Sequence, residues 1–174
     1  MFWALALDIF HYIYNNPWTH ALKGKRILLI SPFEESLKEK IPIRSKIYDG
    51  VDLFPDCEFI ILKPPQTQAG ENSRGFTVEL NEFKERVENI IDSFDIALVS
   101  CGGYANPICS FIYEKGKSAI YVGGVLQMYF GILGARWIQE RNDIVKLFHN
   151  KHWSRPKVNE RPRDSKKVEG GCYW

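Results

Sequence analysis

Four short apolar runs, each long enough for one buried strand, constrain the fold of this chain more than any other feature. The runs lie at residues 25–31, 58–63, 95–100 and 118–122. Each is nearly continuous in apolar residues, which is typical of parallel strands that are covered on both faces. Segments with helical spacing separate the runs. The sequence therefore predicts an α/β fold, a Rossmann-like three-layer sandwich whose mainly parallel sheet has about four strands.

The segments beside these strands predict six helices, at residues 2–14, 36–43, 77–94, 107–115, 125–133 and 143–149, and Pro42 is expected to interrupt the second. Thr77, Asn106 and Asp143 are the expected N-caps, since their side chains accept hydrogen bonds from unpaired backbone amides. Pro107 suits a first helical position, and Gly116 predicts the end of that helix. The segment 125–133 is apolar almost all round, so we expect a buried helix there.

Length and charge predict one folded domain followed by a tail. Residues 1–150 are expected to form the Rossmann-like domain, with an amino-terminal helix within residues 1–24, and residues 151–174 a basic tail with an aromatic end. The net charge of +2 is too small to indicate nucleic acid, and a solvated surface segment is the favoured interpretation of the tail. We expect Tyr173 and Trp174 to dock, either beside the ligand edge or on the core far from any site.

The cysteine and histidine pattern predicts a reduced, cytoplasmic chain without a metal site of its own. The four cysteines include no CxxC pair, and the four histidines are scattered. The only D-x-E triplet, at residues 56–58, lies where a strand begins rather than where one ends. No apolar run is long enough to span a membrane.

The segments that follow the four strands are the candidate site, because ligands of open parallel sheets bind beyond the carboxyl ends of the strands. These segments, 31–35, 63–66, 100–104 and 123–127, contain polar, glycine or proline residues. In the third segment, Gly102 and Gly103 remove side chains at a turn that leads into a helix, and Tyr104 follows them. Backbone amides at the start of a helix favour anions, phosphates above all. The turn matches neither the GxGxxG nor the P-loop pattern.

Four other side chains are candidates for this site, each with a structural alternative. Lys63 is expected to neutralise a diphosphate, or else to be solvated. Gln127 is expected either to bind a ligand or to satisfy a nearby backbone group. Glu34 and Glu35 are candidate bases for an acceptor hydroxyl, although a solvated pair that opens a helix is favoured.

Two segments of the chain are similar to a known family. The run from Ala97 to Tyr104, a strand followed by two glycines, and the run from Lys117 to Gly124 resemble the carboxyl half of the GT-D type glycosyltransferases. That family transfers sugars from nucleotide-sugar donors on a Rossmann-like sheet. The resemblance spans residues 25–135 and is strongest over 95–130. It implies donor contacts at five residues, with Gly102, Gly103 and Asn106 near the diphosphate and Gly123 and Gly124 along the pocket.

One departure from the family affects the expected activity. The acidic metal motif of the family lies in an amino-terminal section, and this chain has no equivalent at the expected ligand edge. Together with an uncapped helix beginning at Met1, this suggests a truncated or split member whose first portion is absent. The expected partner is either a second copy, in a homodimer, or a protein that supplies the missing amino-terminal portion. The resemblance implies a nucleotide-sugar donor, a glycan acceptor and Mn²⁺ or Mg²⁺. The alternative is a non-catalytic nucleotide-binding or protein-interaction module.

Overall fold

Four parallel strands form one sheet in the computed structural model, which describes residues 16–68 and 73–174. The sheet order is β2-β1-β3-β4, and every pair of neighbours is parallel. The strands are β1 (Arg26–Ile30), β2 (Glu58–Leu62), β3 (Ile96–Val99) and β4 (Ser118–Tyr121). Each predicted strand is confirmed, with its ends within one residue. The predicted helix at 2–14 lies outside the described residues.

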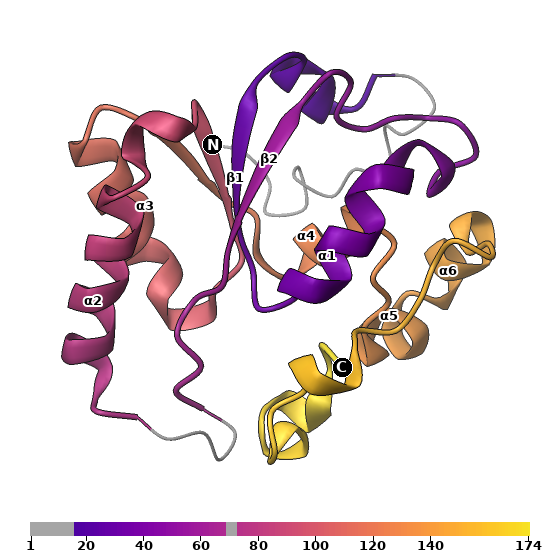
Figure 1. The fold of residues 1–174 in the computed structure, drawn as a ribbon. Coiled ribbons are helices and arrows are strands. Elements are labelled where there is room, and N and C mark those ends of the chain that lie inside the picture. Colours follow the sequence, from indigo (N-terminus) through magenta and orange to yellow (C-terminus); the bar gives the residue numbers. More distant parts are fainter. Residues whose placement is uncertain (1–15, 69–72) are drawn as a thin grey trace, which may run out of the picture.

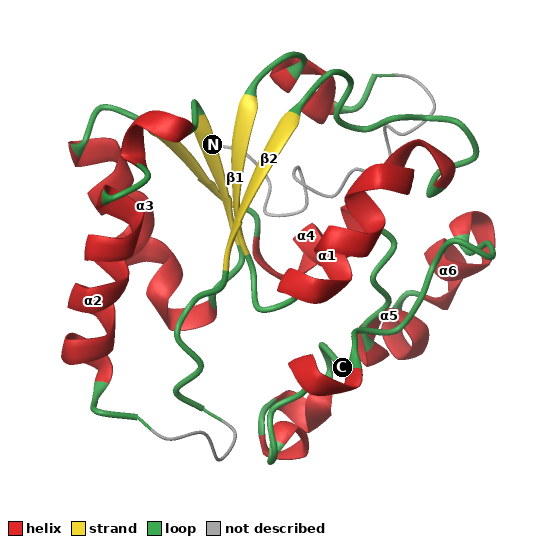
Figure 2. Ribbon diagram, viewed as in Figure 1, coloured by secondary structure: helices red, strands yellow, loops and turns green. Residues whose placement is uncertain are grey.

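Helices cover both faces of the sheet, which confirms the predicted three-layer α/β sandwich (Figures 1 and 2). One face is covered by α2 (Phe76–Glu88) and α3 (Ala105–Glu114). The other face is covered by α1 (Glu34–Lys40) and α4 (Leu126–Tyr129), with α5 (Ala135–Glu140) and α6 (Asn142–Phe148) packed beyond them. The sequence did not predict α5.

Alternate residues of the strands enter two separate cores. Leu28 and Ile30 of β1 are fully buried against Phe83 of α2 and Ile108 of α3. The intervening Leu29 belongs to the second core, on the α1 side of the sheet. Because side chains of a strand alternate between faces, an apolar residue at every position is what a doubly covered strand requires.

Two helices end before the last residue predicted for them. The first, α1, begins at Glu34 and gives way to a 3₁₀ turn over Ile41–Lys46, because Pro42 has no amide with which to continue the helical hydrogen bonds. The second, α2, ends at Glu88, and a 3₁₀ turn over Ile91–Ser93 reverses the chain into β3. The prediction of one helix through residue 94 is therefore wrong, although Phe94 is fully buried.

Three predicted N-caps are also wrong. Gly75, with φ of 96°, precedes α2, so that Thr77 lies inside the first turn. A 3₁₀ turn over Gly102–Tyr104 runs directly into α3 and places Asn106 within the helix, where its side chain makes no capping bond. Asp143 is likewise inside the first turn of α6. Gly116, with φ of 77°, follows α3 as predicted.

The apolar segment predicted as a helix at 125–133 is helical only at its start. A 3₁₀ turn over Gly123–Val125 leads into α4, which ends at Tyr129. Gly131 then adopts φ of 67°, and Ile132 forms a parallel bridge with Ser154. The segment is buried as predicted. Its apolar character reflects burial on all sides rather than helical structure.

Residues 151–174 lie against the α/β body as a series of short turns. Three 3₁₀ turns occupy Val158–Glu160, Ser165–Lys167 and Glu169–Gly171. Trp153 and Trp174 are buried near the two ends of this segment. Figure 1 shows it, in orange and yellow, beside α5 and near the end of the sheet where β1 and β2 finish.

Candidate functional site at the carboxyl edge of the sheet

A cavity of about 380 Å³ lies at the carboxyl edge of the sheet, and we call it the sheet-edge cavity. The segments after all four strands line it, and the start of α2 and the carboxyl-terminal segment complete its wall. The lining residues are Pro32, Phe33, Pro64, Pro65, Gln66, Thr67, Gln68, Phe76, Ser100, Cys101, Gly102, Gly103, Tyr104, Tyr121, Gly123, Gly124, Val168, Glu169, Tyr173 and Trp174.

The strand order explains why a cavity forms here. The adjacent strands β1 and β3 are followed by connections to opposite sides of the sheet, because β2 lies beyond β1 and β4 lies beyond β3. The connections therefore separate just outside the carboxyl ends of β1 and β3. Such a switch point is where open α/β sheets bind their ligands.

The turn after β3 brings bare backbone to the cavity. Gly102 and Gly103 both line it, and a β-carbon built on either glycine would meet no atom within 4 Å. Gly102 has φ of 54°, which an L side chain rarely adopts. The turn continues into the ten-residue helix α3, whose N-terminal end carries partial positive charge. The structure thus leaves open space in front of a helix start.

Two aromatic rings form a platform beside this turn. The rings of Phe76 and Tyr104 stack with centroids 4.8 Å apart and planes 16° apart. The Tyr104 hydroxyl and Thr67 Oγ1 are 3.0 Å apart in a hydrogen bond, which ties the platform to the segment after β2. Phe76 is 49% exposed, so much of this ring is available to a ligand.

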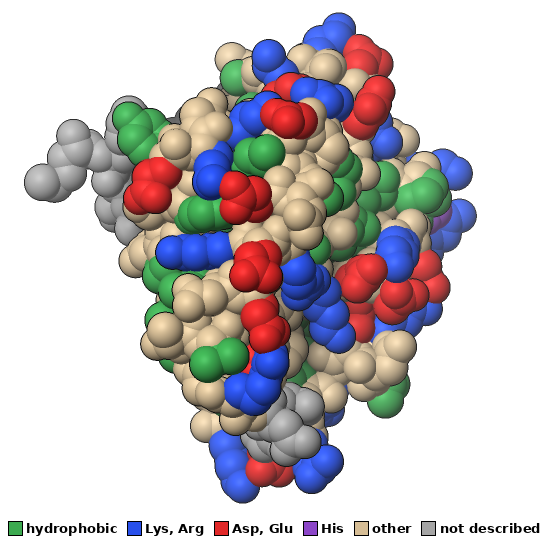
Figure 3. Space-filling model, turned by 60° about the vertical axis from the view of Figure 1, so that its left-hand side comes forward, with side chains coloured by type: hydrophobic (Ala, Val, Ile, Leu, Met, Phe, Trp, Pro, Cys, Tyr) green, Lys and Arg blue, Asp and Glu red, His purple; other side chains and the backbone are tan. Residues whose placement is uncertain are grey.

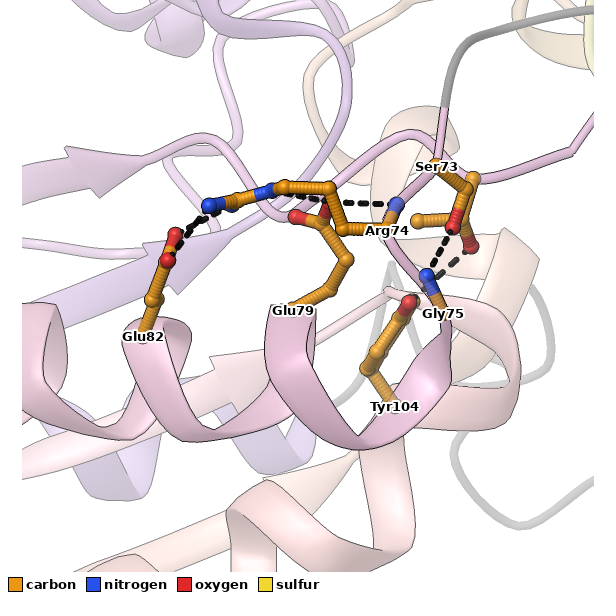
Figure 4. A network of polar contacts seen from close by, with 7 residues as sticks. Ser73, Arg74, Gly75, Glu79, Glu82 and Tyr104 are labelled. Atoms are coloured by element: carbon orange, nitrogen blue, oxygen red, sulfur yellow. Dashed lines mark hydrogen bonds and ion pairs between the residues drawn. The ribbon is translucent and has the colours of Figure 1, made fainter.

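The start of α2 is held by an ion-pair network next to the platform (Figure 4). Arg74 donates from Nη1 to Glu82 Oε1 at 2.6 Å, and its Nε lies 3.3 Å from Glu79 Oε1. The Gly75 amide donates to Ser73 Oγ at 3.1 Å. Figure 4 also shows Tyr104, whose hydroxyl is hydrogen-bonded to Thr67. These contacts fix the backbone that presents Phe76.

The aromatic end of the chain forms the opposite wall, beside the ligand edge. A β-carbon at Gly124 would lie only 2.8 Å from Tyr173 Cε1, so the absence of a side chain there admits the Tyr173 ring. The Trp174 indole donates to the Glu160 carbonyl at 3.1 Å and packs edge-on against Phe33. Of the two docking positions expected for these aromatics, the structure has the one at the sheet edge.

Glu169 is the only charged side chain among the described residues that line the cavity. Its Oε2 accepts hydrogen bonds from Arg136 and from Cys172 Sγ, the latter at 3.3 Å. The bond from Cys172, followed by that from Arg136, lowers the pKa of Glu169. Burial raises the pKa of Cys101 to about 12, which keeps that thiol neutral. Among the described lining residues, the cavity therefore offers one side-chain carboxylate and no thiolate near neutral pH.

The structure brings together five of the ten candidate site residues. Gly102, Gly103, Tyr104, Gly123 and Gly124 all line the sheet-edge cavity. Asn106 is exposed on α3 and lies outside the lining. Lys63 is also exposed outside it, and its carbonyl accepts a hydrogen bond from Arg86.

The remaining three candidates serve structural contacts. Glu34 and Glu35 lie in the first turn of α1, and both form ion pairs with Lys38, at 2.8 and 3.1 Å. Neither lines the cavity, so a role as a base stays a prediction without geometric support. Gln127 is buried and donates from Nε2 to the carbonyls of Ile132 and Tyr173. Its Oε1 has no hydrogen-bond partner among the described residues.

No family model, curated protein or solved structure matches this chain significantly. The geometry of the sheet-edge cavity is therefore the basis for any functional assignment.

Sequence reasoning missed Phe76 and Glu169 as lining residues. Phe76 lies before the predicted helix start, so its position depended on where α2 begins. Glu169 precedes Gly170 and Gly171, and all three adopt positive φ. A pair of glycines shortly before two aromatic residues was the available signal of a tight turn at this end of the chain.

Three further properties of the described residues bear on the expected function. None of their helices combines the length and the apolar character that crossing a bilayer requires. No three of their His, Cys, Asp or Glu side chains gather closely enough to hold a metal ion. All four cysteines lie in this part of the chain and are free thiols.

The charge distribution is mixed on the one face that Figure 3 presents. There, Lys and Arg side chains are interspersed with Asp and Glu side chains among the residues drawn in colour. Such interspersed charges do not create the extended positive field that attracts nucleic acid.

Proposed function

We propose that the sheet-edge cavity binds a nucleotide sugar and that the chain is a glycosyltransferase-like domain. The observation that carries the proposal is that the segments after all four strands line one cavity at the switch point between β1 and β3. A volume of about 380 Å³ lies within the range of small-molecule sites. The glycine turn and the aromatic platform then divide the cavity into two chemically different parts.

The two parts suit the two ends of a nucleotide. The Gly102–Gly103 turn offers backbone without side chains at the start of α3, which suits phosphate oxygens. The half-exposed Phe76 ring, backed by Tyr104, offers a flat apolar surface for a base. No Lys or Arg lines the cavity among the described residues, so the phosphates would depend on amides and the helix end.

The geometry supports binding more directly than sugar transfer. A metal-dependent transferase needs acidic ligands for Mn²⁺ or Mg²⁺, and the described lining supplies a single acidic side chain, that of Glu169. These residues therefore do not fit a divalent metal site. The non-catalytic nucleotide-binding module remains the alternative, and a turnover measurement separates it from a transferase.

The test is thermal unfolding of the full chain with UDP-, GDP-, dTDP- and CDP-sugars, each with and without Mn²⁺. A ligand at 100 times its Kd stabilises by about 2.7 kcal/mol, a shift of several degrees for a chain of this size. We expect nucleotide sugars of one nucleotide class to raise the unfolding temperature of the protein. Release of nucleoside diphosphate in the same samples would identify a transferase, and stabilisation without release would identify a binding module.

A pair of variants links any stabilisation to the cavity. Gly103→Leu places a side chain into the open space before the turn and is expected to abolish the shift. Asn106→Leu alters an exposed residue of the same helix outside the lining and is expected to keep it. No stabilisation of the wild type by any nucleotide sugar, or equal shifts in the wild type and the Gly103 variant, would contradict the proposal.

A further inference from the structure

Glu169 combines three properties that a purely structural surface residue does not need. It lines the sheet-edge cavity, it is the only charged side chain among the described lining residues, and it has φ of 46°. A non-glycine residue in the left-handed region is strained, and such strain persists where the surrounding structure imposes it, often at ligand sites. Gly170 and Gly171 continue the turn with φ of 65° and 79°.

The contacts of Glu169 orient its carboxylate. Arg136 and the Cys172 thiol both bind Oε2. Arg136 also lies 5.2 Å from the centre of the Tyr173 ring and donates its backbone amide to the Cys172 carbonyl at 2.9 Å. Glu169 is thereby held on the wall that packs against the turn after β4 through Gly124 and Tyr173. Its lowered pKa keeps it ionised near neutral pH, so it accepts hydrogen bonds and does not donate them.

An ionised carboxylate beside aromatic rings selects for hydroxyl groups. Oε2 already accepts from Arg136 and Cys172, so ligand hydroxyls would bind mainly through Oε1. One carboxylate oxygen has two lone pairs and can accept from two neighbouring hydroxyls, whereas the carboxylate repels phosphate. The glycine turn that suits phosphate follows β3, and Glu169 belongs to a different wall. A ligand with phosphate at one end and a hydroxylated ring at the other fits both walls.

We propose that the Glu169 carboxylate accepts hydrogen bonds from vicinal hydroxyl groups on a sugar ring of the bound ligand. The inference rests on the proposed nucleotide-sugar binding and names its specificity-determining residue. The shared chemistry is a vicinal diol, which either the ribose or the attached sugar supplies.

The experiment is isothermal titration calorimetry of the full chain with three probes. They are the nucleoside diphosphate of the class selected by thermal unfolding, its glucose conjugate and its 2′,3′-dideoxy form; for uridine these are UDP, UDP-glucose and 2′,3′-dideoxy-UDP. If Glu169 binds the ribose diol, Glu169→Gln weakens UDP by about tenfold or more and leaves dideoxy-UDP within twofold. If it binds the attached sugar, only UDP-glucose is weakened.

Two further variants separate this role from an effect on folding. Glu169→Gly removes the carboxylate but suits the left-handed backbone, so its loss of affinity cannot be attributed to strain. Glu140→Gln removes another carboxylate near Arg136, since Glu140 Oε1 lies 3.9 Å from Arg136 Nε. Glu140 does not line the cavity. We expect Glu169→Gly to bind the three probes as Glu169→Gln does, and Glu140→Gln to bind them as the wild type does.

The remaining outcomes overturn the inference in distinguishable ways. If the Glu169 variants bind all three probes as the wild type does, the carboxylate does not contact a sugar, and nucleotide binding itself stands. If all three probes weaken equally, Glu169 supports the wall without recognising hydroxyl groups, and the inference is again wrong. If the wild type binds none of the probes, both the inference and the proposed function fall.

Discussion

The carboxylate of Glu160 accepts hydrogen bonds from both the backbone amide and the hydroxyl of Ser36, 124 residues earlier in the chain. The Lys157 amide donates to the same carboxylate at 3.0 Å, and the backbone carbonyl of Glu160 accepts from the Trp174 indole. Both Ser36 and Glu160 are buried. This contact fastens the carboxyl-terminal segment to the start of α1 and so fixes one wall of the sheet-edge cavity.

Replacing Glu160 with alanine should therefore destabilise the whole protein. The change leaves the amide and the hydroxyl of Ser36 without their acceptor, and the Lys157 amide keeps only its bond to Ser36 Oγ at 3.1 Å. We therefore expect a loss of about 2–4 kcal/mol in the free energy of unfolding. Urea denaturation measures it. Glu39→Ala is the control, because Glu39 forms an exposed ion pair with Lys157 and should cost about 0–1 kcal/mol. Equal effects of the two variants would show that the buried contact adds nothing.

A methyl group at Gly124 should displace Tyr173. The new β-carbon of Gly124→Ala would lie 2.8 Å from Tyr173 Cε1, and crowding of this kind costs about 1–3 kcal/mol. Gly103→Ala is the matched control, because a β-carbon there meets nothing within 4 Å, and it should be neutral within about 0.5 kcal/mol. In the double variant with Tyr173→Ala, the Gly124 effect should largely disappear. If the effects of Gly124→Ala and Tyr173→Ala on stability simply add in the double variant, the strain does not lie between these two residues.

Stability between pH 4 and pH 2 should depend on Asp95. Hydrogen bonds from the Arg26 side chain and then from the Arg26 amide lower the pKa of Asp95 to about 2. Because this folded-state pKa lies below the unfolded value of about 3.9, the contribution of Asp95 is present above pH 4 and is lost as the pH falls toward 2. The free energy of unfolding of Asp95→Asn, measured by urea denaturation at several pH values, should therefore change less over this range than that of the wild type.

The control for this pH dependence is Asp56→Asn. Asp56 pairs with Lys23 at 3.5 Å, and both side chains are mostly exposed. Such a pair contributes little to stability, so this variant should follow the wild-type pH profile. If the Asp95 and Asp56 variants show the same profile, the Arg26–Asp95 pair does not control acid stability.

Phe76→Ala should weaken ligand binding without a comparable loss of stability. Its ring is half-exposed, so truncation removes little core, whereas stacking on a base is worth about 1–3 kcal/mol, or roughly 5–150-fold in Kd. Calorimetric titration with the stabilising nucleotide measures the change. Tyr113→Ala is the control, since Tyr113 is 77% exposed on α3 and does not line the cavity. Unchanged affinity in the Phe76 variant would show that the platform does not contact the ligand.

The strands and the segments that follow them were predictable because their signals are local. A continuous apolar run such as residues 95–100 needs cover on both faces, whatever its neighbours are. Parallel strands place all their carboxyl ends at one edge, so the polar and glycine segments after them had to lie near one another. Gly102, Gly103 and Tyr104 could therefore be assigned to the cavity edge from the sequence.

Helix ends were less predictable, because they depend on how the chain must leave each helix. Asn106 is a good capping residue by type, yet the turn at Gly102–Tyr104 continues into α3 and leaves no cap position for it. The apolar segment after Val125 satisfies helical spacing, but Gly131 and the bridge between Ile132 and Ser154 take it out of the helix. In both places tertiary contacts outweigh the local preference.

The sequence by itself determined the sheet, its two covered faces and the edge at which a ligand could approach, because apolar periodicity and glycine turns act over a few residues. Only the tertiary structure decided which side chains face that edge. Glu34 and Glu35 form ion pairs with Lys38 and do not line the cavity. Glu169, more than 130 residues later in the sequence, lines the cavity and is held by a hydrogen bond from Arg136. Contacts between residues so far apart depend on the packing of the whole chain, which no local pattern records.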